Sequence, residues 1–132
     1  MNKITKYGLL ILKNNKFLIN RKKGTTLFLL PGGKPKNNET PEGCLEREIF
    51  EEHKCKLKKE TLQFIGEFED KAANEPNTLI HIKLYKGQID GEPKISSEIE
   101  EMRWFGSEEN PEFLSPILKN KILPELIKKK IV

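Results

Sequence analysis

A glycine turn placed directly before a glutamate-rich helix is the feature that most limits how this chain can fold. Pro31-Gly32-Gly33 stops an apolar run, and it lets the backbone bend sharply and approach a ligand closely. Thr40 and Pro41 then mark the start of a helix, since threonine caps a helix and proline suits its first position. The helix is predicted to extend to about His53.

Three carboxylates on one face of this helix are the second constraint. Glu48, Glu51 and Glu52 are three and four residues apart, so they share a stripe of about 100°. Like charges at this spacing cost about 0.2–0.5 kcal/mol per exposed pair. A solvated acidic face is one interpretation. However, Glu51 and Glu52 lie at the wrong end for the helix dipole, and apolar Leu45 and Ile49 flank the stripe. A divalent cation would reverse the repulsion, because hard cations bind carboxylate oxygens.

The glycine turn adds groups that suit an anion. Gly33 offers bare backbone and Lys34 offers a positive charge to a chain of phosphates. A tight turn without a ligand would have the same sequence, so the evidence is the position of this turn between a predicted buried strand and an acidic helix. Gly33 and Lys34 are therefore predicted to bind the substrate.

The other apolar runs predict several strands and a second helix. Residues 4–13 and 16–20 are predicted to form a hairpin at Asn14-Asn15, because asparagine tolerates the positive φ of a tight turn. Further strands are expected at residues 25–30, 62–68, 79–85 and 98–105, with a polar loop at 70–77. The second helix should begin near Ser115-Pro116, and Pro124 should kink it. This mixture favours an α+β fold or an α/β/α sandwich.

Length, charge and cysteines set the broad class. A chain of 132 residues is expected to form one domain over residues 1–132. No apolar stretch is long enough for a bilayer and the start lacks a signal-like run, so a cytoplasmic protein without a membrane partner is expected. Cys44 and Cys55 should lie roughly 16 Å apart at opposite ends of the helix, too far for a disulfide. The net charge is +4, but the lysines are scattered and no aromatic-and-basic motif accompanies them, so nucleic acid is not the expected partner.

The stretch around the acidic helix resembles the Nudix box. That pattern is Gly, five residues, Glu, seven residues, Arg-Glu, an aliphatic residue, any residue, Glu-Glu, any residue, Gly and an aliphatic residue. Here five residues separate Gly33 from Glu39, and seven more lead to Arg47-Glu48 and then to Glu51-Glu52. The flanking residues 29–34 and 97–105 are also similar to MutT-like members of the family. The resemblance implies a Nudix hydrolase, with a mixed central β-sheet between helices in an α/β/α sandwich.

The resemblance also implies roles for individual residues. Glu48, Glu51 and Glu52 would hold Mg²⁺, for which Mn²⁺ could substitute, together with the backbone carbonyl of Gly32. Arg47 would orient these carboxylates, a task that suits the guanidinium fork. Glu39 would support the loop and helix or assist the chemistry. The predicted general base is Glu48, or Glu98 reaching in from the strand at 98–105; a plain surface position for Glu98 is the alternative.

Lys54 departs from the pattern, because the family has glycine there. That glycine ends the helix in a left-handed conformation. We expect Lys54 to adopt this conformation, whereas the alternative is a helix that continues through it. Since Lys54 carries none of the implied chemistry, the departure bears on the helix end and not on activity.

The resulting functional hypothesis is an enzyme with a small nucleotide substrate. It would cleave the diphosphate bond of a nucleoside diphosphate linked to another group, such as a nucleoside triphosphate, and release a nucleoside monophosphate-type product. ADP-ribose and dinucleoside polyphosphates are alternative substrates, and a non-catalytic nucleotide- or nucleic-acid-binding Nudix module is a further alternative. Residues 113–117 lack the asparagine that some MutT-like members use, which argues against oxidised guanine nucleotides. The sequence leaves open whether the protein forms a homodimer.

Overall fold

Two small β-sheets and two helical segments make up the fold, in a computed structural model that describes residues 1–73 and 75–132. The strands are β1 (Asn2–Leu10), β2 (Leu12–Lys13), β3 (Lys16–Lys22), β4 (Gly32–Gly33), β5 (Lys56–Lys71), β6 (Thr78–Asp90) and β7 (Ile99–Phe105). The helices are α1 (Pro41–His53), a 3₁₀ turn (Pro111–Phe113), a π-helical segment (Leu118–Ile122) and α2 (Leu123–Lys128). The predicted α+β class with a mixed sheet is confirmed.

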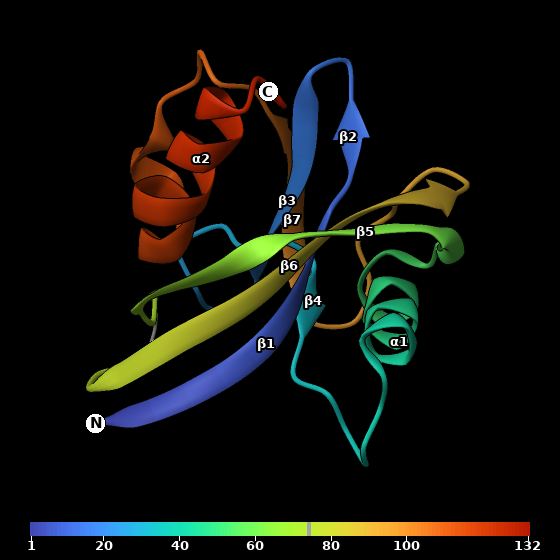
Figure 1. The fold of residues 1–132 in the computed structure, drawn as a ribbon, viewed down its shortest axis with the longest axis horizontal. Coiled ribbons are helices and arrows are strands. Elements are labelled where there is room, and N and C mark those ends of the chain that lie inside the picture. The colour runs from blue at the N-terminus through green and yellow to red at the C-terminus, as the bar shows by residue number, and fades with distance from the viewer. Residues whose placement is uncertain (74) are drawn as a thin grey trace.

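The mixed sheet has the strand order β4-β1-β6-β5. β1 and β6 are parallel, while β4 and β5 pair antiparallel at the two edges. The second sheet has the order β2-β3-β7 and is antiparallel. The π-helical turn and α2 form one continuous helical stretch over residues 116–128, which we call the C-terminal helical segment. α1 and this segment lie on opposite sides of the strands (Figure 1). The expected sandwich is thus present, with its strands divided between two sheets.

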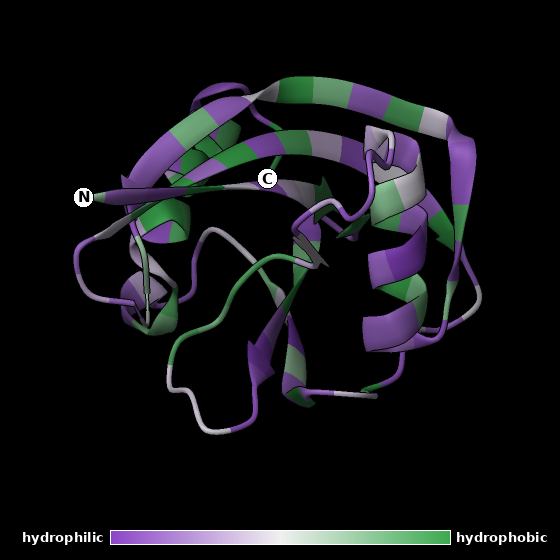
Figure 2. Ribbon diagram, turned by 90° about the horizontal axis from the view of Figure 1, so that it is seen from below, coloured by the Kyte–Doolittle hydropathy of each residue, from purple (hydrophilic) through white to green (hydrophobic). Residues whose placement is uncertain are grey.

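Two apolar clusters join these layers. On one side, Leu45 and Ile49 of α1 are buried together with Leu9, Leu18 and Leu57. On the other side, the C-terminal helical segment packs on the opposite strand faces. This cluster includes Leu118, Ile122 and Leu126 from the helical segment and Leu10, Phe17 and Leu84 from the strands. Figure 2 shows the corresponding alternation of apolar and polar residues along the strands, as expected because successive side chains of a strand point to opposite faces of the sheet. No helix in the described part of the chain has the length and apolarity needed to cross a membrane.

Most of the predicted elements are present, but one predicted strand does not form. The hairpin turns at Asn14 and Asn15, both with positive φ. However, its first arm is shorter than predicted, because residues 2–10 form β1 beside β6 and only β2 pairs with β3. The strand predicted at residues 25–30 is wrong: that segment forms only single bridges, from Leu29 to Asn20 and from Phe28 to Leu114. Two of its apolar side chains, Phe28 and Leu30, are buried, but its backbone does not pair with either sheet along its length.

The observed bounds of β5 and of the loop after it also differ from the predicted ones. β5 begins well before residue 62. The sequence did not indicate this start, because most of the first residues of β5 are charged and carry no apolar alternation. The loop expected at 70–77 starts after Lys71, and its residue 74 lies outside the described residues. The kink expected at Pro124 takes the form of a π-helical turn just before it, closed by a bond from the Leu123 N–H to the Leu118 carbonyl. Proline cannot donate the usual helical bond, so a wider turn accommodates it.

Lys54 ends α1 in the left-handed conformation, as expected. Its φ and ψ are 56° and 32°, and its N–H donates to the Phe50 carbonyl. Its Nζ lies 4.9 Å from the centre of the Phe50 ring, which is exposed. Lysine therefore bears a conformational cost here that its contact with the ring partly offsets.

Replacing Lys54 with glycine should stabilise the protein modestly. Glycine removes a left-handed cost of about 1 kcal/mol, while loss of the exposed cation–π contact costs about 0.5 kcal/mol. We expect a net gain of about 0.5 kcal/mol in the free energy of unfolding, measured by urea denaturation. Lys56→Gly, in the exposed start of β5, is the control and should destabilise the protein. A loss of stability in Lys54→Gly would contradict this account of the helix end.

Candidate active site

Arg47 of α1 lies at the centre of a group of carboxylates. Its Nε and Nη2 donate to the two oxygens of Glu39, both at 2.9 Å, and form a bidentate fork. Its Nη1 donates to Glu48 at 2.9 Å and to Glu51 at 3.3 Å. Its Nη2 also reaches the Lys34 carbonyl at 3.0 Å. The hydrogen bonds from Arg47 lower the pKa of Glu39 to about 2, so this carboxylate is charged at neutral pH. Arg47 therefore ties the glycine loop to the acidic face of α1.

Glu52 is the most buried of the acids. Only 7% of its surface is exposed, and its Oε1 accepts the Gly32 N–H at 3.1 Å. Burial, followed by the nearby charge of Glu48, raises the pKa of Glu52 to about 8. Burial and a hydrogen bond with Glu51 also raise the pKa of Glu48. The acids predicted from the helix spacing thus lie close enough for their neighbours to disfavour the charged forms of Glu48 and Glu52.

The two glycines of β4 allow this close packing. Gly32 has a φ of 137°, and a Cβ atom there would overlap the Tyr7 carbonyl oxygen. A Cβ atom on Gly33 would overlap the Glu48 carboxylate. The backbone of β4 therefore occupies space that a side chain would need, and it brings the Gly32 amide to Glu52.

Two adjoining cavities open beside these acids. The first, which we call the acidic cavity, measures about 380 Å³. It is lined by Lys6, Lys22, Gly33, Lys34, Lys36, Arg47, Glu48, Glu51, Glu52, Ser97, Glu98 and Ile99. The second, which we call the apolar cavity, measures about 230 Å³ and lies among β1, β6 and the start of the C-terminal helical segment. The two cavities share Lys6, Lys22, Gly33 and Glu52.

Comparison with known proteins now identifies the fold and its acidic helix. The family model for the NUDIX domain matches residues 5–126. The chain belongs to the Nudix family. It is therefore a hydrolase of the class that acts on nucleotide diphosphate compounds and generally needs a divalent cation. A search of curated proteins gives no significant match.

Solved structures with the same fold include several Nudix proteins. The MutT Nudix hydrolase of Burkholderia pseudomallei has a TM-score of 0.77 and 22% identity, covering 95% of this chain and 98% of that one. The ORF135 protein of E. coli has a TM-score of 0.77 and 20% identity, covering 98% and 92%. A bifunctional NMN adenylyltransferase/ADP ribose pyrophosphatase of Francisella tularensis, complexed with AMP and a Mn ion, has a TM-score of 0.65 and 20% identity, covering 96% and 42%. Identities this low show the fold alone.

The structure of this Nudix hydrolase brings most of the predicted site residues together. Gly33, Lys34 and the three acids of α1 all line the acidic cavity. Glu98 also lines it, but from the turn before β7 and not from the strand itself. Its side chain is 75% exposed and lies 3.9 Å from Lys22 Nζ. Glu39 is not among the residues that line the cavity, so its geometry supports the loop and Arg47.

Sequence reasoning missed four residues that the fold adds. Lys6 and Lys22 reach both cavities from β1 and β3, and burial together with Lys22 lowers the pKa of Lys6. Asn20 of β3 lines the apolar cavity. Ser115 lines it too, is 1% exposed, and has an Oγ without a hydrogen-bond partner in the described part of the chain. These residues come from separate elements, and no spacing in the sequence connects them.

The donor set fits a divalent cation. Among the described residues, no three acidic, histidine or cysteine side chains are yet gathered around a common point. The reason is visible in the contacts: Arg47 holds Glu48 and Glu51, while Gly32 holds Glu52. However, all three acids line one cavity, and carboxylate oxygens are the ligands that Mg²⁺ and Mn²⁺ prefer.

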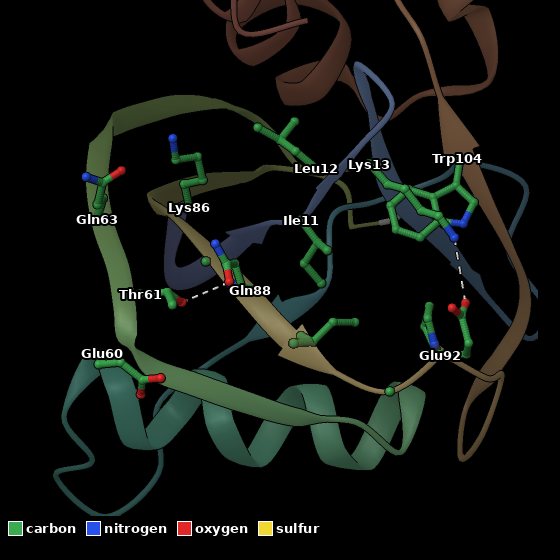
Figure 3. Close-up of a pocket in the computed structure, with 14 residues that line it drawn as sticks. Ile11, Leu12, Lys13, Glu60, Thr61, Gln63, Lys86, Gln88, Glu92 and Trp104 are labelled. Carbon is green, nitrogen blue, oxygen red and sulfur yellow. Dashed lines mark hydrogen bonds and ion pairs between the residues drawn. The ribbon is translucent and has the colours of Figure 1, made fainter.

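A larger cavity of about 670 Å³ lies elsewhere (Figure 3). It shares no lining residue with the acidic cavity. Its Lys13 lies over Trp104 and pairs with Glu92 at 3.8 Å. The acidic residues predicted from the sequence therefore lie at the acidic cavity and not at this larger one.

The stability of the metal-free protein should depend on pH through Glu52. Its pKa is raised from 4.5 when unfolded to about 8 when folded. Its stabilising contribution is therefore complete below the lower value and is lost as the pH rises through the higher one. We expect the Tm in chelator to fall between about pH 6 and about pH 9. Millimolar Mg²⁺ should raise the Tm more at the higher pH, because metal binding needs ionised carboxylates.

Differential scanning fluorimetry at both pH values measures these shifts. Glu52→Gln is the control, since it removes the titrating group and should flatten the difference. An equal effect of Mg²⁺ at both pH values in the wild-type protein would contradict the account.

Proposed function

We propose that this protein is a Mg²⁺-dependent pyrophosphohydrolase of nucleoside diphosphates linked to another group, such as nucleoside triphosphates. The observation that carries the proposal is the junction of the two cavities. One side holds clustered carboxylates that suit a cation with phosphates, and the other is a small, largely apolar space. A substrate that fits both must have an anionic chain joined to a less polar group.

The acidic cavity supplies the groups for the diphosphate end. Glu48, Glu51 and Glu52 would hold Mg²⁺, or Mn²⁺, with the Gly32 carbonyl as a further oxygen ligand. When bound, the cation neutralises phosphate charge and makes the attacking water more acidic. Arg47 then keeps Glu48 and Glu51 oriented, because its fork is anchored on Glu39.

Cations from outside the helix bind the phosphate chain in this proposal. Lys6 and Lys22 stand where the cavities meet, and Lys34 borders the acidic cavity. Lys6 makes no ion pair within the described residues, and the pair from Lys22 to exposed Glu98 is long at 3.9 Å. Two lysines that repel each other gain stability when an anion lies between them.

A carboxylate must accept the proton of the attacking water. Glu48 is one candidate, because it lines the acidic cavity beside Glu51 and Glu52. Glu98 is the other candidate, at the rim of the same cavity. Of the two, Glu48 is the better placed, because it is partly buried whereas Glu98 is mostly exposed.

The apolar cavity would hold the nucleoside end. Its apolar lining comes from Leu29, Leu30, Ile80, Ile82, Ile117 and Leu118. Its volume is below the usual 300–1,000 Å³ of ligand sites, so it accommodates part of the substrate. Ser115 provides a hydroxyl that can donate or accept a hydrogen bond with a polar group of that part.

The metal assignment predicts a loss of turnover in two variants. Glu51→Gln and Glu52→Gln should each remove most hydrolysis while the fold survives, because a neutral amide lacks the negative charge with which a carboxylate binds the cation. A panel of nucleotides with Mg²⁺, followed by phosphate detection after coupling enzymes and product identification, measures turnover and substrate. The panel includes ADP-ribose, UDP-sugars, dinucleoside polyphosphates and oxidised guanine nucleotides.

Glu46→Gln is the matched control on the same helix. Glu46 pairs with Lys59 at 3.4 Å and is not among the residues lining either cavity. It should keep wild-type turnover. If Glu51→Gln and Glu52→Gln both kept near-wild-type hydrolysis with the same Mg²⁺ dependence, the site would be assigned wrongly.

The nucleoside assignment predicts opposite effects of Ser115→Ala on stability and on binding. A buried hydroxyl without a partner costs about 1–3 kcal/mol, so its removal should raise the Tm of the free protein. The same change should raise KM for the preferred nucleotide, because a substrate hydrogen bond is lost. Ser107→Ala, at an exposed turn, should change neither quantity. An unchanged KM in Ser115→Ala would exclude this hydroxyl from substrate binding.

A further inference from the structure

A fully buried polar pair lies directly behind the acidic residues of α1. Asn20 of β3 is 1% exposed and His53, the last residue of α1, is 0% exposed. The Asn20 Nδ2 and the His53 Nε2 are 3.0 Å apart. The His53 Nδ1 lies 2.8 Å from the Lys94 carbonyl oxygen. Polar groups this deep are costly unless each of them is paired, so the pair needs an explanation.

The Lys94 carbonyl determines where the protons of this pair lie. A carbonyl oxygen can only accept, so the His53 Nδ1 must carry a proton and donate it. In a neutral imidazole the Nε2 is then an acceptor. It can only be satisfied if the Asn20 amide turns its NH₂ group toward the ring. The orientation of the Asn20 amide thus follows from the Lys94 carbonyl, to which it is connected through the His53 ring by two hydrogen bonds.

The Asn20 amide retains a second N–H beside the one turned toward His53. Asn20 also favours the charged form of Glu52, which lowers the pKa of Glu52 against the larger effect of burial. Asn20 and Glu52 also line the same apolar cavity. The backbone of Asn20 is held in place by the two hydrogen bonds that it exchanges with Leu29, at 2.8 and 2.7 Å. The position of the Asn20 side chain is therefore set by a hydrogen-bonded backbone.

We propose that Asn20 is a positioning residue for Glu52, oriented by His53, and that together with the Gly32 N–H it holds the Glu52 carboxylate ready to bind the divalent cation. The inference rests on the proposed function, in which Glu52 is a metal ligand. Two donors from different elements would then fix one carboxylate, Gly32 from β4 and Asn20 from β3. Partners that hold a metal ligand in this way typically change metal affinity about 10–100-fold when they are removed.

The test measures Mn²⁺ affinity by electron paramagnetic resonance on the full-length protein without a nucleotide. Asn20→Leu removes the amide at similar volume, and His53→Met removes the ring acceptor. Both should weaken Mn²⁺ binding about 10–100-fold. His53→Gln keeps an acceptor toward Asn20, and it should restore most of the affinity. Asn20→Ala and His53→Leu serve if either of the first two changes prevents folding.

Two controls separate positioning from general destabilisation. Ile19→Val loosens the packing beside Asn20 in β3 without removing a polar group, and it should leave Mn²⁺ affinity unchanged. In a double-mutant cycle, Asn20→Leu should have no further effect once Glu52→Gln is present, because both then act on one carboxylate. A further loss in the double variant would overturn the proposal.

The outcomes also distinguish this inference from the proposed function. If Glu52→Gln weakens Mn²⁺ binding while the folded Asn20 variants bind it as tightly as the wild type, the positioning role is wrong and the metal site stands. If Glu52→Gln itself leaves Mn²⁺ binding unchanged, the metal assignment fails and the positioning role fails with it.

Discussion

Repulsion between the carboxylates of α1 is the constraint on which the rest of the structure depends. Three acids share one helix face, and the one nearest the core, Glu52, is almost fully buried. The surrounding residues oppose this repulsion at specific points. Arg47 binds Glu48 and Glu51 and is itself anchored by Glu39, so the loop that carries Glu39 has to fold back on the helix. The path of residues 33–40 follows from that requirement.

The sequence predicted the parts of this arrangement that depend on local spacing. The start of the helix followed from Thr40 and Pro41, and the shared face of the acids followed from the helical repeat. Even the departure at Lys54 was interpretable, since a left-handed residue is what ends a helix of this kind. The recognisable order of glutamates and arginine extended this prediction from a helix to a family.

The remaining residues of the site could not be found in this way, because they meet only after folding. Lys6, Asn20 and Ser115 come from β1, β3 and the start of the C-terminal helical segment. Each looks ordinary in its own segment, and only tertiary contacts make it unusual. The same reason explains the error at residues 25–30: an apolar composition indicates burial, which is present, but pairing depends on which strand lies alongside.

The division of the site into two cavities has a consequence for how such an enzyme can change. The carboxylates and their supports lie on α1 and the glycine loop, whereas the lining of the apolar cavity comes largely from other strands and from the C-terminal helical segment. Of the described residues, only four belong to both cavities. In the proposed function, substitutions in the apolar lining can therefore redirect the enzyme to a different nucleotide without disturbing the carboxylates of the acidic cavity. One reaction centre can in this way serve many substrates as the wall beside it diverges.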